Sequence, residues 1–155
     1  MTLAVVTGAA RGIGRAIAAG LTGDGYEVVT VDRAGADVLA DLADTRALAE
    51  LVDGVRREHG PIGVLVNNAG TARLEHFNEI TVDSWRHVMV VNCDAPFFLS
   101  QRTAEHMIAD GVEGRMDGGV LADQMPRRRF MPPYRNSVSW PRELSDRALN
   151  RNSVS

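Results

Sequence analysis

Residues 3–14 read Leu-Ala-Val-Val-Thr-Gly-Ala-Ala-Arg-Gly-Ile-Gly, and the fold class follows from this stretch. The apolar run Leu3–Val6 predicts a short buried strand, and the glycines after it predict a tight turn. Ile13, Ile17 and Leu21 then recur at helical spacing, which predicts a helix directly after the turn. A strand, a glycine turn and a helix in this order indicate the start of a βαβ unit.

The alternation of strand and helix continues to about residue 115. We predict further strands over residues 27–32, 36–40 and 62–66, and helices over residues 45–58, from 81 onward and over about 92–109. Thr81 is the expected N-cap of its helix, and Pro96 is expected to kink or restart the last one. This alternation predicts an α/β fold with a Rossmann-like, doubly wound parallel sheet.

The glycine turn is suited to binding a phosphate group. Glycines let backbone N–H groups approach a pyrophosphate at the N-terminus of a helix, where the helix dipole favours anions. Asp32 stands eighteen residues after Gly14, at the end of the next predicted strand. A carboxylate there can accept hydrogen bonds from a ribose diol. The alternative is a plain strand-to-helix turn with a surface aspartate, and the two features together disfavour it.

Thr7-Gly8-x-x-x-Gly12-Ile13-Gly14, followed by Asn67-Asn68-Ala69-Gly70, resembles the motifs of the short-chain dehydrogenase/reductase family. In that family the second motif steadies the central sheet and lines the cofactor cleft. The resemblance extends over residues 2–115 and implies an NAD(P)-dependent oxidoreductase. The cofactor-binding residues that it implies are Thr7, Gly8, Arg11, Gly12, Ile13, Gly14, Asp32, Arg33, Asp41, Leu42, Asn68, Ala69 and Gly70.

Two of the cofactor-binding assignments and one catalytic assignment each rest on a single short motif. Asp41-Leu42 resembles the pair that contacts the adenine ring, and Asn92 matches the helix asparagine associated with the family's catalytic water network. Asn67 and Asn68 follow a buried strand, at the edge where open α/β sheets bind ligands. Their amides can bond backbone groups across that crevice, although a purely structural role in a turn is equally compatible.

The cofactor is expected to be NAD, with NADP the less favoured alternative. Asp32 should repel a 2′-phosphate, and its carboxylate contacts the ribose directly. Arg11 and Arg33 favour NADP instead, because either guanidinium could neutralise a phosphate. Only about eight residues separate Asp32 from Asp41, which is too few for a crossover helix plus a strand, so this connection is expected to be abbreviated.

The family's catalytic serine and Tyr-x-x-x-Lys pair are not found in this sequence. In the family the tyrosine exchanges a proton with the substrate oxygen, and the lysine holds the nicotinamide ribose. All seventeen basic residues here are arginine. Val138 stands where lysine would follow Tyr134, Leu121 stands where the serine is expected, and Tyr26 precedes the second strand. Arginine does not replace the lysine conservatively, so we predict that the chain alone is inactive.

The regular pattern of apolar residues ends after Arg115, and the composition changes. Residues 116–155 contain Arg127–Arg129, four of the six prolines and two copies of Arg-Asn-Ser-Val-Ser. We expect a dinucleotide-binding domain over residues 1–115 and a divergent, poorly ordered tail over 116–155, and a shifted reading frame or truncated gene would explain the change. About four of the family's seven strands would then be present, leaving the strand 62–66 with an exposed apolar edge.

Composition excludes several other classes of protein. The 155 residues carry a net charge of −3, which attracts no nucleic acid, and no apolar run reaches the roughly 18–20 residues of a membrane span. A lone cysteine, Cys93, cannot form an internal disulfide, so a cytoplasmic protein is expected. No metal is expected, since the histidines lack ligand spacing and are interpreted as surface or helix-face residues: His59, His76, His87 and His106.

Three functional hypotheses follow from the sequence. The first is an oxidoreductase whose intact form transfers a hydride between NAD(P) and a small-molecule alcohol or ketone. The second is a non-catalytic dinucleotide-binding fragment, a pseudoenzyme that partners a full-length relative. The third is a degenerate gene product without stable function. The helix after Asn92 often forms a subunit interface in the family, so a homo-oligomer through that helix is also expected.

Overall fold

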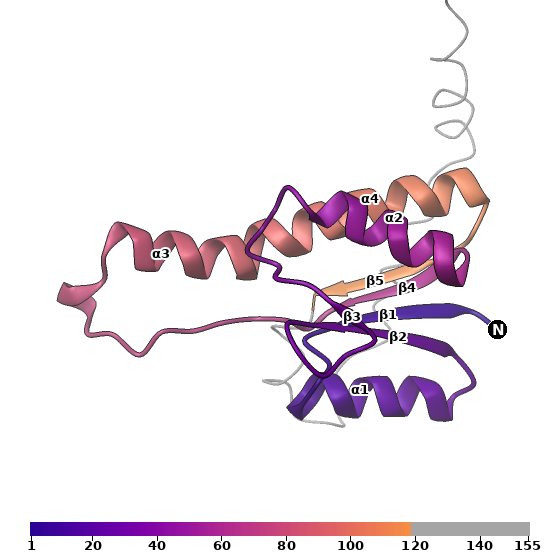
Figure 1. Ribbon diagram of the computed structural model, residues 1–155, viewed down its shortest axis with the longest axis horizontal. Coiled ribbons are helices and arrows are strands. Elements are labelled where there is room, and N and C mark those ends of the chain that lie inside the picture. The colour runs from indigo at the N-terminus through magenta and orange to yellow at the C-terminus, as the bar shows by residue number, and fades with distance from the viewer. Residues whose placement is uncertain (119–155) are drawn as a thin grey trace, which may run out of the picture.

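Five parallel strands, in the spatial order β3-β2-β1-β4-β5, form the centre of a computed structural model that describes residues 1–118 (Figure 1). Every pairing in the sheet is parallel, which confirms the predicted Rossmann-like α/β class. The strands are β1 (Leu3–Thr7), β2 (Glu27–Asp32), β3 (Val38–Leu39), β4 (Ile62–Asn67) and β5 (Arg115–Gly118).

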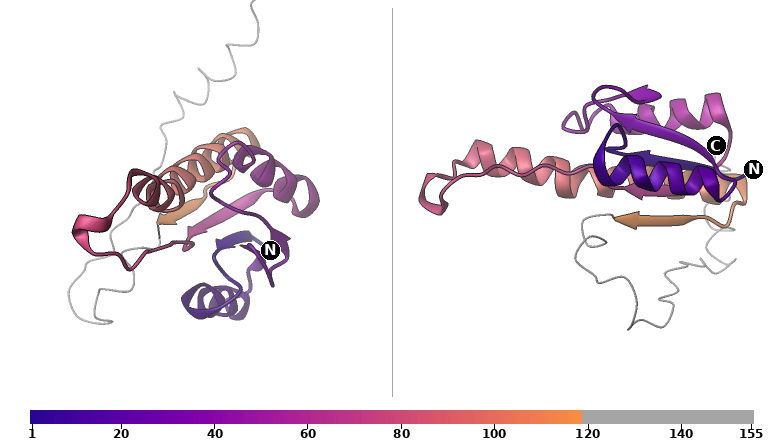
Figure 2. Two further views of the ribbon diagram at one scale, coloured as in Figure 1. Left: turned by 60° about the vertical axis from the view of Figure 1, so that its left-hand side comes forward. Right: turned by 90° about the horizontal axis from the view of Figure 1, so that it is seen from below.

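Helices cover both faces of this sheet. They are α1 (Gly12–Gly23), α2 (Leu48–His59), α3 (Val82–Met89) and α4 (Ala95–Asp110), with a 3₁₀ turn at Phe77–Glu79 and a π-helical turn at Val90–Asp94. Figure 2 shows α1 (indigo) on one face and α2 (magenta) and α4 (orange) together on the other. The doubly wound arrangement therefore holds for the described residues.

The core lies on both sides of β1, whose five residues are all buried. On one face, α2 contributes Leu48, Val52 and Val55, which recur at helical spacing and pack in the same cluster as Leu99 of α4. On the other face, Ala18 of α1 packs in a smaller cluster with residues of β1 and the following turn. Burial on both faces explains why β1 and β4 read as unbroken apolar runs.

Ion pairs join α2 to α4 at the edge of the larger core. Asp53 of α2 accepts hydrogen bonds from Nε and Nη2 of Arg102 at 2.7 and 2.8 Å, and its Oδ1 lies 2.6 Å from Nε2 of His106. Hydrogen bonds from Arg102 and His106 hold the pKa of the Asp53 carboxyl far below its usual range. Arg56 and Asp110 form a second pair between the same helices.

The connection between β2 and β3 is as short as the sequence predicts. Thr30 of β2 and Asp37 close it with reciprocal bonds: the Asp37 carboxylate accepts from the Thr30 amide (2.9 Å) and hydroxyl (2.6 Å), and the Asp37 amide donates to that hydroxyl (3.0 Å). No helix lies between the two strands. The pair holds the turn in place of a crossover helix.

Two expectations about the end of the sheet are wrong. We expected about four strands and an exposed edge at residues 62–66, but β5 pairs with β4, placing Val64 opposite Arg115 and Asn67 opposite Gly118. The reason is a short alternating pattern: Met116 packs against the core while its neighbours Arg115 and Asp117 are exposed. The strand crosses the expected boundary between residues 115 and 116, and the remainder of the expected tail lies outside the described residues.

The last two helices are joined without a loop. The Thr81 hydroxyl accepts a hydrogen bond from the Ser84 amide (3.1 Å), which confirms the predicted N-cap of α3. The π-helical turn then leads into α4, where Pro96 occupies the first turn. The α-helix therefore restarts at Ala95, directly after the π-helical turn and one residue before Pro96.

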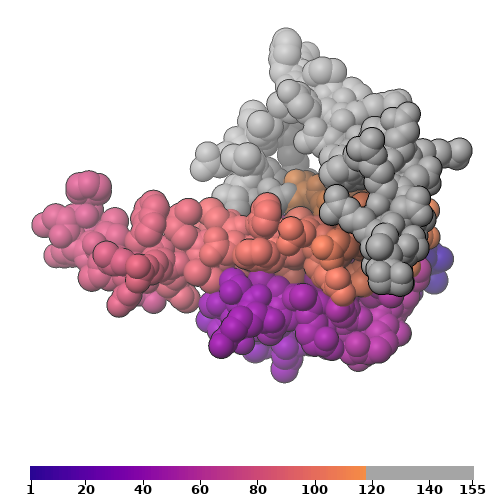
Figure 3. All heavy atoms as spheres, turned by 90° about the horizontal axis from the view of Figure 1, so that it is seen from above, coloured from indigo at the N-terminus to yellow at the C-terminus, as the bar shows by residue number. Residues whose placement is uncertain are grey.

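This pair of helices extends beyond the sheet. The space-filling view shows α3 and the residues before it (pink) projecting from the rest of the described residues (Figure 3). Large apolar side chains are exposed along this projection and on α4: Leu74, Phe77, Ile80, Val82, Trp85, Phe97 and Phe98. Within residues 1–118, no helix has the length and apolar character that crossing a membrane requires.

Candidate cofactor site

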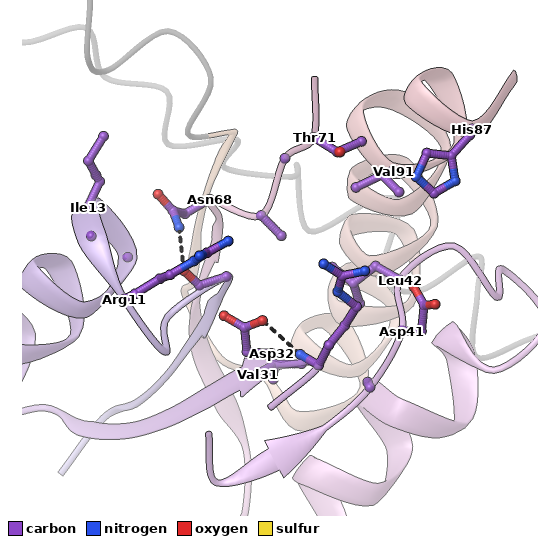
Figure 4. Close-up of a pocket in the computed structure, with 17 residues that line it drawn as sticks. Arg11, Ile13, Val31, Asp32, Asp41, Leu42, Asn68, Thr71, His87 and Val91 are labelled. Carbon is purple, nitrogen blue, oxygen red and sulfur yellow. Dashed lines mark hydrogen bonds between the residues drawn. The ribbon is translucent and has the colours of Figure 1, made fainter. Parts of the chain in front are cut away.

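A cavity of about 480 Å³ lies at the carboxyl ends of β1, β2 and β4 (Figure 4). Twelve of the thirteen residues that the sequence assigns to a cofactor line it, and Thr7 is the exception. The complete lining is Gly8, Arg11, Gly12, Ile13, Gly14, Val31, Asp32, Arg33, Ala40, Asp41, Leu42, Asn68, Ala69, Gly70, Thr71, His87 and Val91. Segments far apart in the sequence thus form one concave surface.

The glycines of the first turn allow close packing and leave the N-terminal end of α1 open. Gly8 has a φ of 64°, and a Cβ there would lie 2.7 Å from Cα of Ala69. A Cβ on Gly14 would overlap the Gly8 carbonyl oxygen and the Asn68 side-chain amide. Gly12 has a φ of 58°, and a Cβ on it would meet nothing within 4 Å. The first turn of α1 is therefore unobstructed where it lines the cavity.

The N-terminus of α1 presents backbone donors to this cavity. Arg11 occupies the N-cap position with an extended backbone, and its side chain caps no donor. The first N–H groups of a helix have no partner within it and carry partial positive charge. Ile13 and the two glycines beside it supply these groups at the cavity wall. Such an end binds a phosphate or another small anion.

Asp32 ends β2 and presents its carboxylate to the cavity. Its Oδ2 accepts a hydrogen bond from the Ala10 amide at 3.0 Å, and its Oδ1 accepts one from the Arg33 amide at 2.7 Å. These bonds tie the glycine turn to the end of β2 and fix the orientation of the carboxylate. Each oxygen can accept a further bond, so hydroxyl donors of a ligand can also be bound.

Thr7 lies beneath the cavity and supports it. The side chain is 1% exposed, and its hydroxyl accepts hydrogen bonds from the amides of Asn68 (3.1 Å) and Ala69 (3.0 Å). The Asn68 side-chain amide donates in turn to the carbonyl oxygens of Thr7 (2.9 Å) and Gly8 (3.0 Å). Asn68 thus bonds backbone groups across the crevice, one of the two roles that the sequence allows.

Asn67 and Asn92 are placed behind the cavity wall. The Asn67 amide donates to Oγ of Ser100 in α4 at 3.0 Å. Asn92, in the π-helical turn, accepts from the Thr71 amide and donates to the Thr71 carbonyl oxygen, both at 2.8 Å. Asn92 does not line the cavity. Within the described residues, Asn92 holds Thr71, which does line the cavity. The position of Asn92 is therefore that of a supporting residue.

The remaining predicted residues lie on the β3 side of the cavity. Leu42 is 7% exposed and belongs to the main core cluster, so it forms a rigid apolar wall. Asp41 is exposed, and its Oδ1 accepts a hydrogen bond from the Ala43 amide at 3.0 Å. Arg11 and Arg33 also line the cavity, and both side chains are exposed. Within residues 1–118, neither guanidinium pairs with a carboxylate, so both can reach an anionic ligand.

A family model described as short chain dehydrogenase matches residues 2–116. The chain belongs to this family. It is 36% identical over 125 residues to gluconate 5-dehydrogenase of Gluconobacter oxydans, covering 70% of this chain and 49% of that protein. It is 39% identical over 124 residues to L-xylulose reductase of Bos taurus, covering 72% and 49%. The chain thus spans about half the length of the curated relatives it matches.

The fold has solved counterparts among short chain dehydrogenases. One from Burkholderia cenocepacia, in complex with NADP, is 32% identical and has a TM-score of 0.69. The match covers 81% of this chain and 58% of that one. Tyr134, Val138 and Leu121, which bear on the family's catalytic serine and Tyr-x-x-x-Lys pair, lie outside the described residues. Within residues 1–118, no group of His, Cys, Asp and Glu side chains is placed to hold a metal ion.

Sequence reasoning missed five lining residues of this short chain dehydrogenase site. Val31, Ala40 and Thr71 are direct neighbours of predicted residues, so their proximity could have been inferred from the motifs. Val91 precedes Asn92 and is signalled in the same way. His87 has no local signal, because it belongs to α3 and follows no strand-end motif.

Proposed function

We propose that this chain binds NAD or NADP in the cavity, as the cofactor-binding half of an oxidoreductase. The observation that carries the proposal is the meeting of three features in one cavity. The open N-terminus of α1 suits a pyrophosphate, the Asp32 carboxylate suits a ribose diol, and the apolar wall at Ala40, Leu42 and Val91 suits a flat base. The cavity volume of about 480 Å³ is typical of small-molecule sites.

The residues present fit the parts of a dinucleotide in the correct order. Gly12 leaves the end of α1 uncovered, as close approach by a pyrophosphate requires. Asp32 is fixed by two backbone donors and lies between that end and the apolar wall. When bound, the nicotinamide would supply the hydride-transfer chemistry of the family. The residues named here would bind the cofactor and orient it.

We propose NAD as the preferred cofactor. A 2′-phosphate next to Asp32 would bring two anions together, whereas a ribose diol would donate to the carboxylate. Arg11 and Arg33 at the rim would reduce the penalty for NADP without removing it. Asp32→Asn keeps the shape and the acceptor oxygen but removes the charge, so it should raise the affinity for NADP relative to NAD by about tenfold.

We also propose an activity for the intact protein, which goes beyond cofactor binding. The names of the relatives favour a polyhydroxylated alcohol or ketone as the substrate of a full-length protein of this kind. The sequence has no lysine, and we propose that the chain alone binds the cofactor without turning over. It would then act with a second chain, and the exposed phenylalanines of α4, Phe97 and Phe98, favour association through that helix.

A fluorescence titration of the full chain with NADH and NADPH tests the cofactor proposal. We expect saturable binding of both, tighter for NADH, and a reversal or levelling of that order in Asp32→Asn. Asp24→Asn is the matched control, since Asp24 caps the far end of α1 and is exposed. Failure of the unaltered chain to bind either nucleotide would refute the proposal. Turnover with polyols by the chain alone would refute the predicted inactivity.

A further inference from the structure

His87 lies on the wall of the cofactor cavity, which the sequence did not indicate. It belongs to the last turn of α3 and lines the cavity together with Val91, one helical turn further on. Figure 4 shows the imidazole on the side of the cavity opposite the glycine turn, above Leu42 and Asp41. The side chain is half-buried. It is therefore a wall residue of the site and not a solvated histidine on a helix face.

The His87 ring can contact a ligand in this cavity. Within residues 1–118, the histidines that lie against a carboxylate are His59, beside Glu27, and His106, beside Asp53. No side-chain hydrogen bond of the described residues involves the imidazole of His87. The part of the wall near it is apolar, because Leu42 and Val91 supply aliphatic surface there. Within residues 1–118, no hydrogen bond or ion pair accounts for the position of this ring.

The order of groups along the cavity identifies the part of the ligand that would reach His87. The pyrophosphate belongs at the N-terminus of α1, and the ribose next to it belongs at Asp32. The base attached to that ribose would extend away from the glycine turn, toward Leu42, Val91 and His87. An imidazole ring packs favourably against a purine through its face, whether or not it is protonated.

We propose that His87 packs its ring against the adenine of the bound dinucleotide, opposite Leu42, and so sets the affinity for the base. The inference rests on the proposed function, since it presupposes a dinucleotide in this cavity. It makes His87 a binding residue for the adenosine half only. The nicotinamide half, which carries the reacting carbon, would not contact it.

Calorimetric titration of the full chain with ADP-ribose tests this proposal, because ADP-ribose retains the adenosine and pyrophosphate but lacks the nicotinamide. We expect His87→Ala to weaken binding by about tenfold and His87→Phe, which keeps a flat ring, to stay within about threefold of the unaltered chain. His76→Ala is the matched control, since His76 is exposed and does not line the cavity. It should bind ADP-ribose as the unaltered chain does.

The outcomes separate this inference from the proposed function. If the unaltered chain binds ADP-ribose and His87→Ala binds it equally well, the role of His87 is refuted and the cofactor site stands. If His87→Phe binds as weakly as His87→Ala, packing by the ring is refuted. If the unaltered chain does not bind ADP-ribose, both proposals fail together. Thermal melts of each variant show whether lost affinity reflects lost folding, and His87→Phe decides the question if His87→Ala melts early.

Discussion

At the scale of single residues, the site depends on glycines, which have no side chain, as much as on residues that have one. Gly14 packs so closely against the Gly8 carbonyl and the Asn68 amide that any side chain would displace one of them. Asn68 is also the residue that ties the turn after β4 to the glycine turn. The phosphate-binding shape and the packing of α1 are therefore determined by the same atoms.

Gly14→Ala should lower the free energy of unfolding by about 1–3 kcal/mol, because the added methyl group overpacks a rigid backbone contact. Urea unfolding followed by circular dichroism measures the change. Gly20→Ala is the control in the same helix, since a Cβ there meets nothing within 4 Å. It should raise stability by about 0.5–1 kcal/mol, as alanine does in a helix interior. Equal effects of the two substitutions would contradict the packing argument.

Asn92 acts in the described residues through Thr71, whose amide and carbonyl it bonds at 2.8 Å each. Asn92→Ala leaves both backbone groups unpaired and should cost about 1–3 kcal/mol of unfolding free energy. It should also weaken NADH binding, because Thr71 lines the cavity. Asn78→Ala, in the exposed 3₁₀ turn, should change neither quantity. An Asn92→Ala chain of unchanged stability would show that the bonds to Thr71 contribute nothing.

At the scale of helices and strands, the ion pairs between α2 and α4 stabilise the face of the sheet behind the cavity. Asp53→Asn should cost about 1–3 kcal/mol of unfolding free energy at neutral pH, because it removes charge-assisted bonds to Arg102 and His106. Asp44→Asn is the control: its pair with Arg46 is solvent-exposed and should be worth less than about 1 kcal/mol.

The pH dependence of this effect has a definite sign. The folded pKa of Asp53 is depressed, mainly by hydrogen bonds from Arg102, so its contribution is present above the unfolded pKa and is lost as pH falls through the folded value. The stability difference between the unaltered chain and Asp53→Asn should thus be constant above about pH 5 and shrink below about pH 4. Urea unfolding at a series of pH values measures it. A difference that grows in acid would contradict the assignment.

Most elements could be predicted from local patterns, and the exceptions have physical causes. The short β2–β3 connection could be predicted from residue spacing alone. The N-cap role of Thr81 could be predicted from its side-chain chemistry. β5 was missed because its four residues give only one partly buried apolar side chain, Met116, and pairing with β4 supplies the remaining stabilisation. The π-helical turn before Ala95 has no sequence signature that distinguishes it from an α-helix.

At the scale of the whole molecule, the exposed apolar surface of α4 predicts self-association. Phe97 is 61% exposed and lies edge-to-face with Phe98, at a centroid distance of 5.3 Å. Phe97→Glu should lower the weight-average mass in sedimentation equilibrium at high concentration, because a charge in an apolar interface is costly. Leu39→Glu alters a side chain that is 65% exposed on β3 and should leave the mass unchanged. A concentration-independent monomer mass for the unaltered chain would refute the prediction.

The cofactor residues were predictable because they follow strands whose carboxyl ends must meet. Gly8, Asp32 and Asn68 come from three parallel strands, and the fold brings any such residues to one edge. His87 could not be predicted in this way, since it comes from a helix that projects beyond the sheet and its position depends on the π-helical turn. Site residues at strand ends can thus be predicted from sequence motifs, whereas those on the opposite wall of the cavity are identified only from the structure.

Hydrogen exchange of backbone amides, measured by mass spectrometry with and without saturating NADH, tests the cofactor site most directly. We predict slower exchange on binding in residues 8–14, 31–33, 40–42 and 68–71, which line the cavity, and unchanged exchange in the outer turns of α2. Protection confined to other segments, or no protection at saturating NADH, would contradict the claim that this cavity binds a nicotinamide dinucleotide.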